Sequence, residues 1–135
     1  RNKLELAVSK KDWSANFFFL GSVPNQDLPV VYSSANCFLQ PSQVEGFPRV
    51  LIEAMSCGLP FVSTDAGGVR DISPDWQQNY VVDRNDFTGL ESALGRMIDS
   101  GTNYQRELGL RNREFCVNNF DTKIIAKMYV DSLLS

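Results

Sequence analysis

The fold is decided by one stretch, Arg49-Val-Leu-Ile-Glu-Ala-Met-Ser-Cys-Gly-Leu-Pro-Phe-Val-Ser-Thr64, and by the loop Asp65-Ala-Gly-Gly68 that follows it. The first half predicts a helix over residues 49–57, which Gly58 ends because glycine adopts the left-handed conformation of a helix C-cap without strain. The second half predicts a strand over residues 60–65. A helix, a strand and a glycine loop in direct succession indicate an α/β domain.

Elements of the same two kinds flank this stretch. The residues through Trp13 are predicted as the end of a helix or a helix–strand connection. An uninterrupted apolar run at residues 16–21 predicts a strand buried on both faces. Apolar residues recur at helical spacing over residues 28–35, after a cap at Asn25 or Asp27. Further strands are predicted at residues 37–40 and 79–83. Further helices are predicted from Asp86 or Thr88 to residue 98, and at residues 103–118 and 122–134. The residues expected in the core include Phe17, Phe18, Phe19, Phe38 and Phe61.

Short strands that alternate with helices favour right-handed crossovers and a parallel sheet with helices on both faces. We therefore predict an α/β fold with a Rossmann-like parallel sheet. Such sheets bind ligands at the carboxyl ends of their strands. The candidate binding segments are thus residues 21–24, 41–48 and 65–71, which mix glycine, small polar residues and carboxylates.

Composition excludes several classes of function. The 135 residues are 43% hydrophobic, which is enough apolar material for one domain with a core. A net charge of −3 lacks the cationic surplus that nucleic-acid binding requires. No apolar run approaches the roughly 20 residues of a membrane-spanning helix. A signal peptide is not predicted either, because the first eight residues alternate charged and apolar side chains. We expect a cytoplasmic protein with no transmembrane segment and no nucleic-acid partner.

The chain contains no histidine, so Ser-His-Asp and Cys-His catalysis and the usual imidazole metal site are excluded. Cys37, Cys57 and Cys116 are odd in number and widely spaced, which argues against a disulfide framework or a metal cluster. Carboxylates, arginines, hydroxyls and backbone amides remain as the chemical groups of any site. We expect no bound metal and no cofactor.

Two carboxylates bracket the start of the predicted helix. Glu45 stands just before it, and Glu53 lies inside it on the face that also holds Arg49. The alternative to a binding role is that Glu53 forms an i,i+4 ion pair with Arg49 on a solvated helix. Such a pair stabilises the helix by about 0.2–0.5 kcal/mol.

The helix start between these carboxylates can bind an anion. Pro48 occupies a first-turn position that needs no N–H donor, and the amides of Arg49, Val50 and Leu51 are expected to be free. Hydrogen bonds from several amides to a charged diphosphate, at roughly 1.5–3 kcal/mol each, would dominate such a site. Carboxylates on either side would repel a diphosphate unless they contact hydroxyl groups at its two ends. A diphosphate between a ribose and a sugar is a nucleotide sugar.

The sequence from Glu45-Gly-Phe-Pro-Arg-Val-Leu-Ile-Glu53 through Phe-Val-Ser-Thr-Asp-Ala-Gly-Gly68 resembles the family 4 retaining glycosyltransferases, which have two carboxylates at this spacing. Residues 19–23 and 32–35 are also similar to that family. The resemblance implies the two-domain GT-B architecture, of which this chain would be the carboxyl-terminal, donor-binding half. The function it implies is transfer of a hexose, with retention, from a UDP- or GDP-sugar to a glycan or lipid-linked acceptor, as in polysaccharide biosynthesis.

Roles for individual residues follow from the same resemblance. Glu45 would contact hydroxyls of the donor sugar and is the candidate catalytic residue, whereas Glu53 would hold the ribose. The resemblance also implies donor contacts for main-chain atoms of Gly46 and Phe47, for the amides of Val50 and Leu51, and for Val23 beside the base. Gly67 and Gly68 are interpreted equally as a turn with positive φ and as a close backbone approach to a ligand.

The chain departs from the family pattern at two points. Asp71 stands where family members usually carry glutamate, one methylene longer. A basic pair that normally precedes the matching region is absent, together with the first strand and the acceptor-binding amino-terminal half. We therefore expect residues 1–135 to be a single, truncated nucleotide-sugar-binding domain that is inactive alone. Membrane attachment of the full protein, peripheral at the inner face, stays open.

Other functions are weaker alternatives. The chain can be an isolated nucleotide-binding module without turnover, or part of another GT-B enzyme such as a sugar-nucleotide epimerase or a phosphorylase. A dinucleotide-binding oxidoreductase fits less well, since no G-x-G-x-x-G segment follows a predicted strand.

Overall fold

The centre of the fold is a three-stranded parallel sheet in a computed structural model that describes residues 2–11 and 14–123. Strands β1 (Phe38–Gln40), β2 (Phe61–Thr64) and β3 (Val81–Val82) lie in that order. Phe38 is opposite Phe61, and Ser63 is opposite Val81. Each strand lies within a predicted one, and all pairs are parallel, so the predicted Rossmann-like α/β fold is confirmed.

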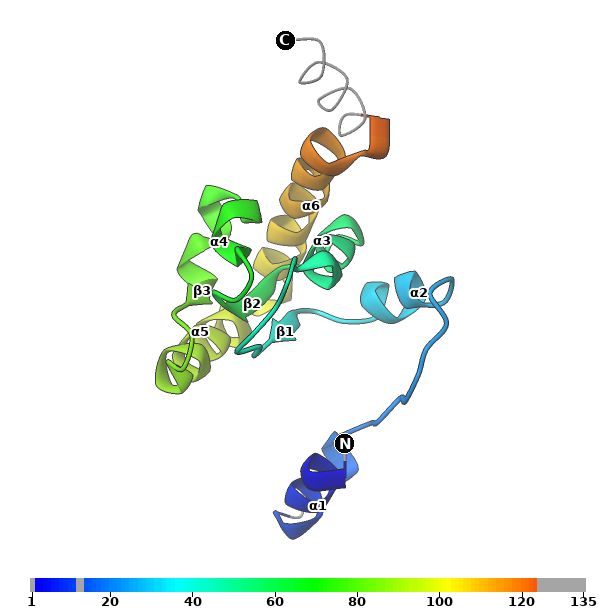
Figure 1. Ribbon diagram of the computed structural model, residues 1–135, viewed down its shortest axis with the longest axis vertical. Helices are drawn as coiled ribbons and strands as arrows, with labels where there is room; N and C mark the ends of the chain where they lie inside the picture. Colours follow the sequence, from blue (N-terminus) through cyan, green and yellow to red (C-terminus); the bar gives the residue numbers. More distant parts are fainter. Residues whose placement is uncertain (1, 12–13, 124–135) are drawn as a thin grey trace.

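Helices connect and cover these strands (Figure 1). The predicted starts and ends are confirmed where a cap defines them. Asp86 caps a helix by accepting a hydrogen bond from the Gly89 amide at 2.8 Å, and Gly58 has the left-handed φ of +81°. The helical elements are α1 (Asn2–Lys10), η1 (Ser14–Asn16), α2 (Leu28–Ser33), α3 (Arg49–Ser56), α4 (Val69–Ile72), η2 (Asp75–Tyr80), α5 (Phe87–Asp99) and α6 (Gly101–Phe120).

The short helices α4 and η2, which connect β2 to β3, were not predicted from the sequence. The predicted helix over residues 122–134 begins at Thr122 and Lys123, and its remainder lies outside the described residues.

The central strand β2 is buried on both faces and divides the core in two. Phe61 packs in one cluster with residues of α3, α4 and α6, such as Leu51 and Val69. Val62, the next residue, packs in a second cluster with residues of η2, α5 and α6, such as Met97. Successive side chains of a strand point to opposite faces, so one strand anchors both helical layers.

Helix α6 approaches the segment before β2 at a position that lacks a side chain. A methyl group built on Gly109 would lie 1.9 Å from the carbonyl oxygen of Gly58. Next to this contact, buried Asn112 of α6 donates to the carbonyl of Leu59 at 3.0 Å and to the side chain of Gln77 at 2.8 Å. A glycine contact and a buried hydrogen-bond network therefore fix α6 against the sheet.

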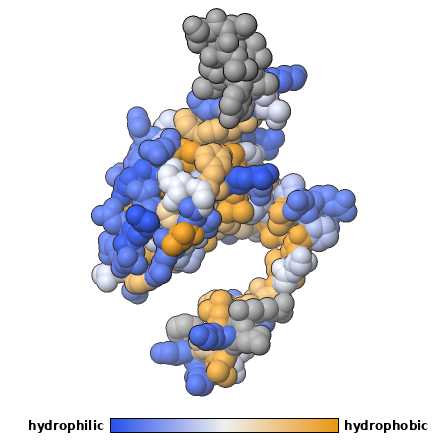
Figure 2. All heavy atoms as spheres, viewed as in Figure 1, coloured by the Kyte–Doolittle hydropathy of each residue, from blue (hydrophilic) through white to orange (hydrophobic). Residues whose placement is uncertain are grey.

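The strand predicted at residues 16–21 is absent, and this prediction was wrong. The segment is extended but pairs with no strand among residues 2–11 and 14–123, and Phe18 is 83% exposed. Figure 1 shows α1 and this segment standing away from the body, and Figure 2 shows apolar surface along it. A strand makes its backbone hydrogen bonds to a neighbouring strand, and a hydrophobic sequence alone does not provide that neighbour. Phe17 and Phe18 are consequently outside the core, whereas Phe61 is fully buried as predicted.

Candidate functional site

The loops that follow β1 and β2 meet at the carboxyl end of the sheet. Gly67 and Gly68 both have left-handed φ values, +66° and +80°. A methyl group built on Gly67 would lie 2.7 Å from Cβ of Glu45 and 2.8 Å from the carbonyl oxygen of Gly46. The fold therefore brings Glu45, Gly46, Gly67 and Gly68 together. The glycine loop is both a turn with positive φ and a close backbone approach, and the partner in this approach is the Glu45 segment itself.

Replacement of Gly67 by alanine should displace Glu45. The added methyl group meets backbone atoms rather than a flexible side-chain end, and its φ is unfavourable for alanine. We expect thermal unfolding to show a loss of about 2 kcal/mol of stability. Gly46→Ala is the matched control, because nothing lies within 4 Å of its added methyl group. Equal stability of the two variants would contradict the close contact between Gly67 and the Glu45 segment.

The carboxylate of Glu45 is held on one side. Its Oε1 atom accepts hydrogen bonds from the hydroxyl of Ser42 at 2.6 Å and from Nε2 of Gln40 at 3.3 Å. Glu45 itself is half-buried, and neighbouring Gly46 has open space around its Cα. The carboxylate thus has one oxygen bonded to Gln40 and Ser42.

The amino-terminal end of α3 offers fewer free amides than the sequence predicts. The Arg49 amide donates to the carbonyl of Phe47 at 2.8 Å, and the Leu51 amide donates to that of Pro48 at 3.1 Å. The expectation that both are free is therefore wrong, because the local turn satisfies them. The Val50 amide has no hydrogen-bond partner among the described residues. Phe47 and Val50 are exposed beside it, whereas the Leu51 side chain is fully buried.

Glu53 lies in a separate cavity of about 380 Å³ between α2 and α3. Its carboxylate accepts a hydrogen bond from the Tyr32 hydroxyl at 3.5 Å. Burial, and to a lesser degree the nearby Glu53 charge, raise the pKa of Tyr32, so the tyrosine stays a neutral donor. Val23 is half-buried in the chain segment that leads into α2. The lining residues are Asn25, Leu28, Pro29, Tyr32, Ile52, Glu53, Ser56 and Cys57.

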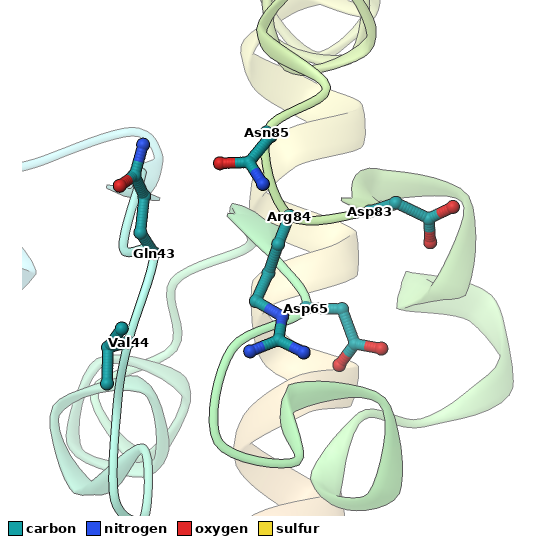
Figure 3. Close-up of a pocket in the computed structure, with 6 residues that line it drawn as sticks. All are labelled: Gln43, Val44, Asp65, Asp83, Arg84 and Asn85. Carbon is teal, nitrogen blue, oxygen red and sulfur yellow. The ribbon is translucent and has the colours of Figure 1, made fainter.

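A second hollow, of about 560 Å³, lies where two of the predicted binding segments, 41–48 and 65–71, meet residues 83–85, whose contribution was not predicted (Figure 3). In it Asp65 and Asp83, which directly follow β2 and β3, both pair with Arg70, at 3.2 and 3.3 Å. Arg84 lines the hollow without an ion pair among the described residues. Charged residues directly after parallel strands were a usable sequence signal, since such ends converge. The residues around the hollow are Gln43, Val44, Asp65, Asp83, Arg84 and Asn85.

Asp71 and the cysteines add little to the site. Asp71 is exposed in the first turn of α4, beside Gly68. Cys37, Cys57 and Cys116 are free thiols. Burial raises the pKa of Cys37 to about 11 and also raises that of Cys57, so neither is activated as a nucleophile. Within the described part of the chain, no three acidic or cysteine side chains gather as a metal site, and no helix has the length and apolarity to span a bilayer.

Comparison with known proteins identifies the family. The family model described as "Glycosyl transferases group 1" matches residues 1–115. The chain belongs to this family. Glu45, Glu53 and the glycine loop are therefore residues of a group 1 glycosyltransferase.

Curated relatives and a solved structure agree with this assignment. The chain is 33% identical over 110 residues to the O-antigen chain mannosyltransferase B of Escherichia coli, covering 79% of this chain and 28% of that protein. It is 28% identical over 120 residues to an alpha-maltose-1-phosphate synthase of Mycolicibacterium smegmatis, covering 85% of this chain and 31% of the relative. The sucrose-phosphate synthase structure from Thermosynechococcus elongatus superposes with a TM-score of 0.85 at 28% identity, covering 98% of this chain and 33% of that one. The chain thus spans a third or less of these proteins.

Proposed function

We propose that this chain is the donor-binding part of a retaining glycosyltransferase that transfers a hexose from a UDP- or GDP-sugar to a glycan or lipid-linked acceptor. The observation that carries the proposal is the contact of Gly67 with Glu45, which puts one carboxylate at the carboxyl end of the sheet. The other carboxylate, Glu53, lies within α3, in the cavity beside α2. A nucleotide sugar between them would have a hydroxyl-bearing group near each carboxylate.

Different residues would contact different parts of this donor. In the proposal, Glu45 accepts hydrogen bonds from hydroxyls of the sugar, and Glu53 accepts them from the ribose. The free amide of Val50 donates to the diphosphate, with Leu51 behind it as part of the same turn. Main-chain atoms of Gly46 and Phe47 line the passage between sugar and phosphates. Val23 lies beside the base, and Gly67 with Gly68 shapes the wall behind Glu45.

The chemistry that these groups supply is stabilisation of the leaving diphosphate. Negative charge grows on its oxygen as the glycosidic bond breaks, and an oriented amide at a helix start is already aligned to meet that charge. The acceptor would bind to a second domain, and catalysis would need both. In the proposal the whole enzyme requires no metal and works in the cytoplasm, with peripheral membrane attachment as one possible location for its acceptor half.

Calorimetry with UDP, GDP and ADP tests the donor site directly. We expect the chain alone to bind its preferred nucleotide near millimolar, about −4 kcal/mol, because the facing domain contributes the remaining contacts. Sugar transfer should require the complete enzyme. Absence of binding of all three nucleotides to both the chain and the complete enzyme would overturn the proposal. Transfer by the chain alone would overturn the division of labour between two domains.

Glu53→Ala in the complete enzyme should weaken nucleotide binding. Hydrogen bonds from ribose hydroxyls to a carboxylate contribute roughly 1.5–3 kcal/mol, so the Kd of the nucleoside diphosphate should rise roughly 10- to 100-fold. Glu91→Ala is the charge-matched control, because Glu91 is an exposed residue of α5 outside this cavity. Calorimetric titration of both variants measures the difference. If the two variants bound equally, Glu53 would have no role in holding the ribose.

A further inference from the structure

We propose that Gln40 and Ser42 are positioning residues that hold Glu45 so that its Oε2 atom, and not Oε1, receives the hydroxyl of the sugar. The inference rests on the proposed function, since it needs Glu45 to contact the donor. Both donors converge on the same oxygen: the Ser42 hydroxyl at 2.6 Å and the Gln40 amide at 3.3 Å bond to Oε1. Oε2 of Glu45 accepts no hydrogen bond from the described residues.

The two donors are themselves fixed by the central strand. Gln40 pairs with Ser63 of β2, whose hydroxyl has two acceptors within reach, the carbonyl oxygens of Thr64 at 2.9 Å and of Gln40 at 3.2 Å. Thr64, the next residue, donates its hydroxyl to the carbonyl oxygen of Ser42. Ser63 and Thr64 are both buried, with 0% and 1% exposure. A rigid strand therefore holds the main chain of the loop, and the loop's side chains in turn hold Glu45.

The amide of Gln40 supports this role over a purely structural one. Gln40 is 5% exposed, and its Oε1 atom is buried with no hydrogen-bond partner among the described residues. A buried, unsatisfied amide oxygen destabilises a fold, so an apolar side chain of the same size would stabilise this position better. The amide is oriented with its NH₂ group toward Glu45, because the reverse would place two acceptors against each other. What the position gains from glutamine is the donor to Glu45.

Orientation matters because the last torsion of a glutamate side chain has no sharp preference. Without donors on Oε1, the carboxylate would rotate, and a substrate hydroxyl would meet it in a distribution of geometries. Misplaced catalytic contacts lower turnover more than they lower binding of a remote group such as the nucleotide. The predicted signature is therefore a fall in kcat with little change in nucleotide affinity.

The test uses Gln40→Met, Ser42→Ala and the double variant in the complete enzyme, with Ser42→Thr as the variant that keeps the hydroxyl. We expect roughly a tenfold fall in kcat for each single loss, and a nucleoside diphosphate Kd within about twofold of wild type. Gln40→Met should melt at or above the wild-type temperature because it removes the unsatisfied oxygen. Ser42→Thr should recover most of the activity lost in Ser42→Ala.

Each outcome separates this inference from the proposed function. Wild-type kcat in the double variant, together with a large loss in Glu45→Ala, would overturn the positioning role and leave the donor site standing. A lower melting temperature that accounts for the lost activity in Gln40→Met would assign Gln40 to stability, and the Ser42 pair would then decide the inference on its own. Wild-type activity in Glu45→Ala would overturn both.

Discussion

Glu45→Ala in the complete enzyme is expected to lower kcat for sugar transfer by roughly 100-fold or more while the Kd of the nucleoside diphosphate changes by less than about twofold. The reason is positional. Glu45 lies against Gly67 at the carboxyl end of the sheet, and Glu53 lies in a different cavity. Loss of Glu45 should remove contacts to the sugar and leave contacts to the nucleotide intact. Steady-state kinetics with the nucleotide sugar and calorimetry with the nucleotide measure the two effects separately.

Two further variants sharpen this experiment. Glu45→Gln keeps the length of the side chain but replaces one acceptor oxygen by a donor, so most of the loss should persist. Glu91→Ala removes the same charge from an exposed position on α5 and should retain full activity. A Glu45→Ala enzyme with a raised nucleotide Kd and an unchanged kcat would reverse the roles proposed for the two carboxylates.

Gly109→Ala is expected to lower the free energy of unfolding by about 3 kcal/mol, since the methyl group would meet the Gly58 backbone at 1.9 Å. Neither partner can yield cheaply: Gly109 lies in the middle of α6, and Gly58 holds the left-handed turn that ends α3. The shift should also strain the buried Asn112 network next to it. Urea unfolding of the variant measures the loss.

Gly95→Ala is the matched control for this substitution. Gly95 is also helical, in α5, but nothing lies within 4 Å of an added methyl group. Alanine stabilises a helix interior by roughly 0.5–1 kcal/mol relative to glycine, so this variant should be more stable than wild type. If both alanine variants shifted stability in the same direction, the contact between α6 and the segment before β2 would not be the close packing described.

The sequence could predict the elements whose signals are local. Gly58 and Asp86 define helix ends by their own conformation or side chain. Gly58 was predicted, and Asp86 was one of the two predicted starts. The meeting of the Glu45 and Gly67 loops follows from the rule that parallel strands end at one edge. The strand predicted at residues 16–21 was wrong because a strand needs a neighbouring strand, which no local sequence pattern reveals. The prediction that the first-turn amides are free was wrong for Arg49 and Leu51 for a similar reason. Whether these amides bond within the turn depends on how the chain enters α3.

The site's tertiary charge pairs lay beyond prediction. Arg70 bridges Asp65 and Asp83 only because α4 turns back over the ends of β2 and β3, and α4 has only four residues. The sequence did not indicate a role for Gln40 either, because glutamine is common at the end of a strand. Its meaning appears only when burial and the bond to Glu45 are seen together.

The segment from β1 through the glycine loop after β2 contains Gln40, Ser42, Glu45 and Gly67, and their mutual contacts arise inside it. The groups proposed to handle the sugar thus form one contiguous cassette. Val23 and Arg84 lie outside it, before and after. A chimera that exchanged this cassette between two group 1 enzymes would move the sugar-handling geometry as a block, whereas recognition of the base would stay with the recipient. Selectivity for the two ends of the donor can therefore diverge independently in evolution.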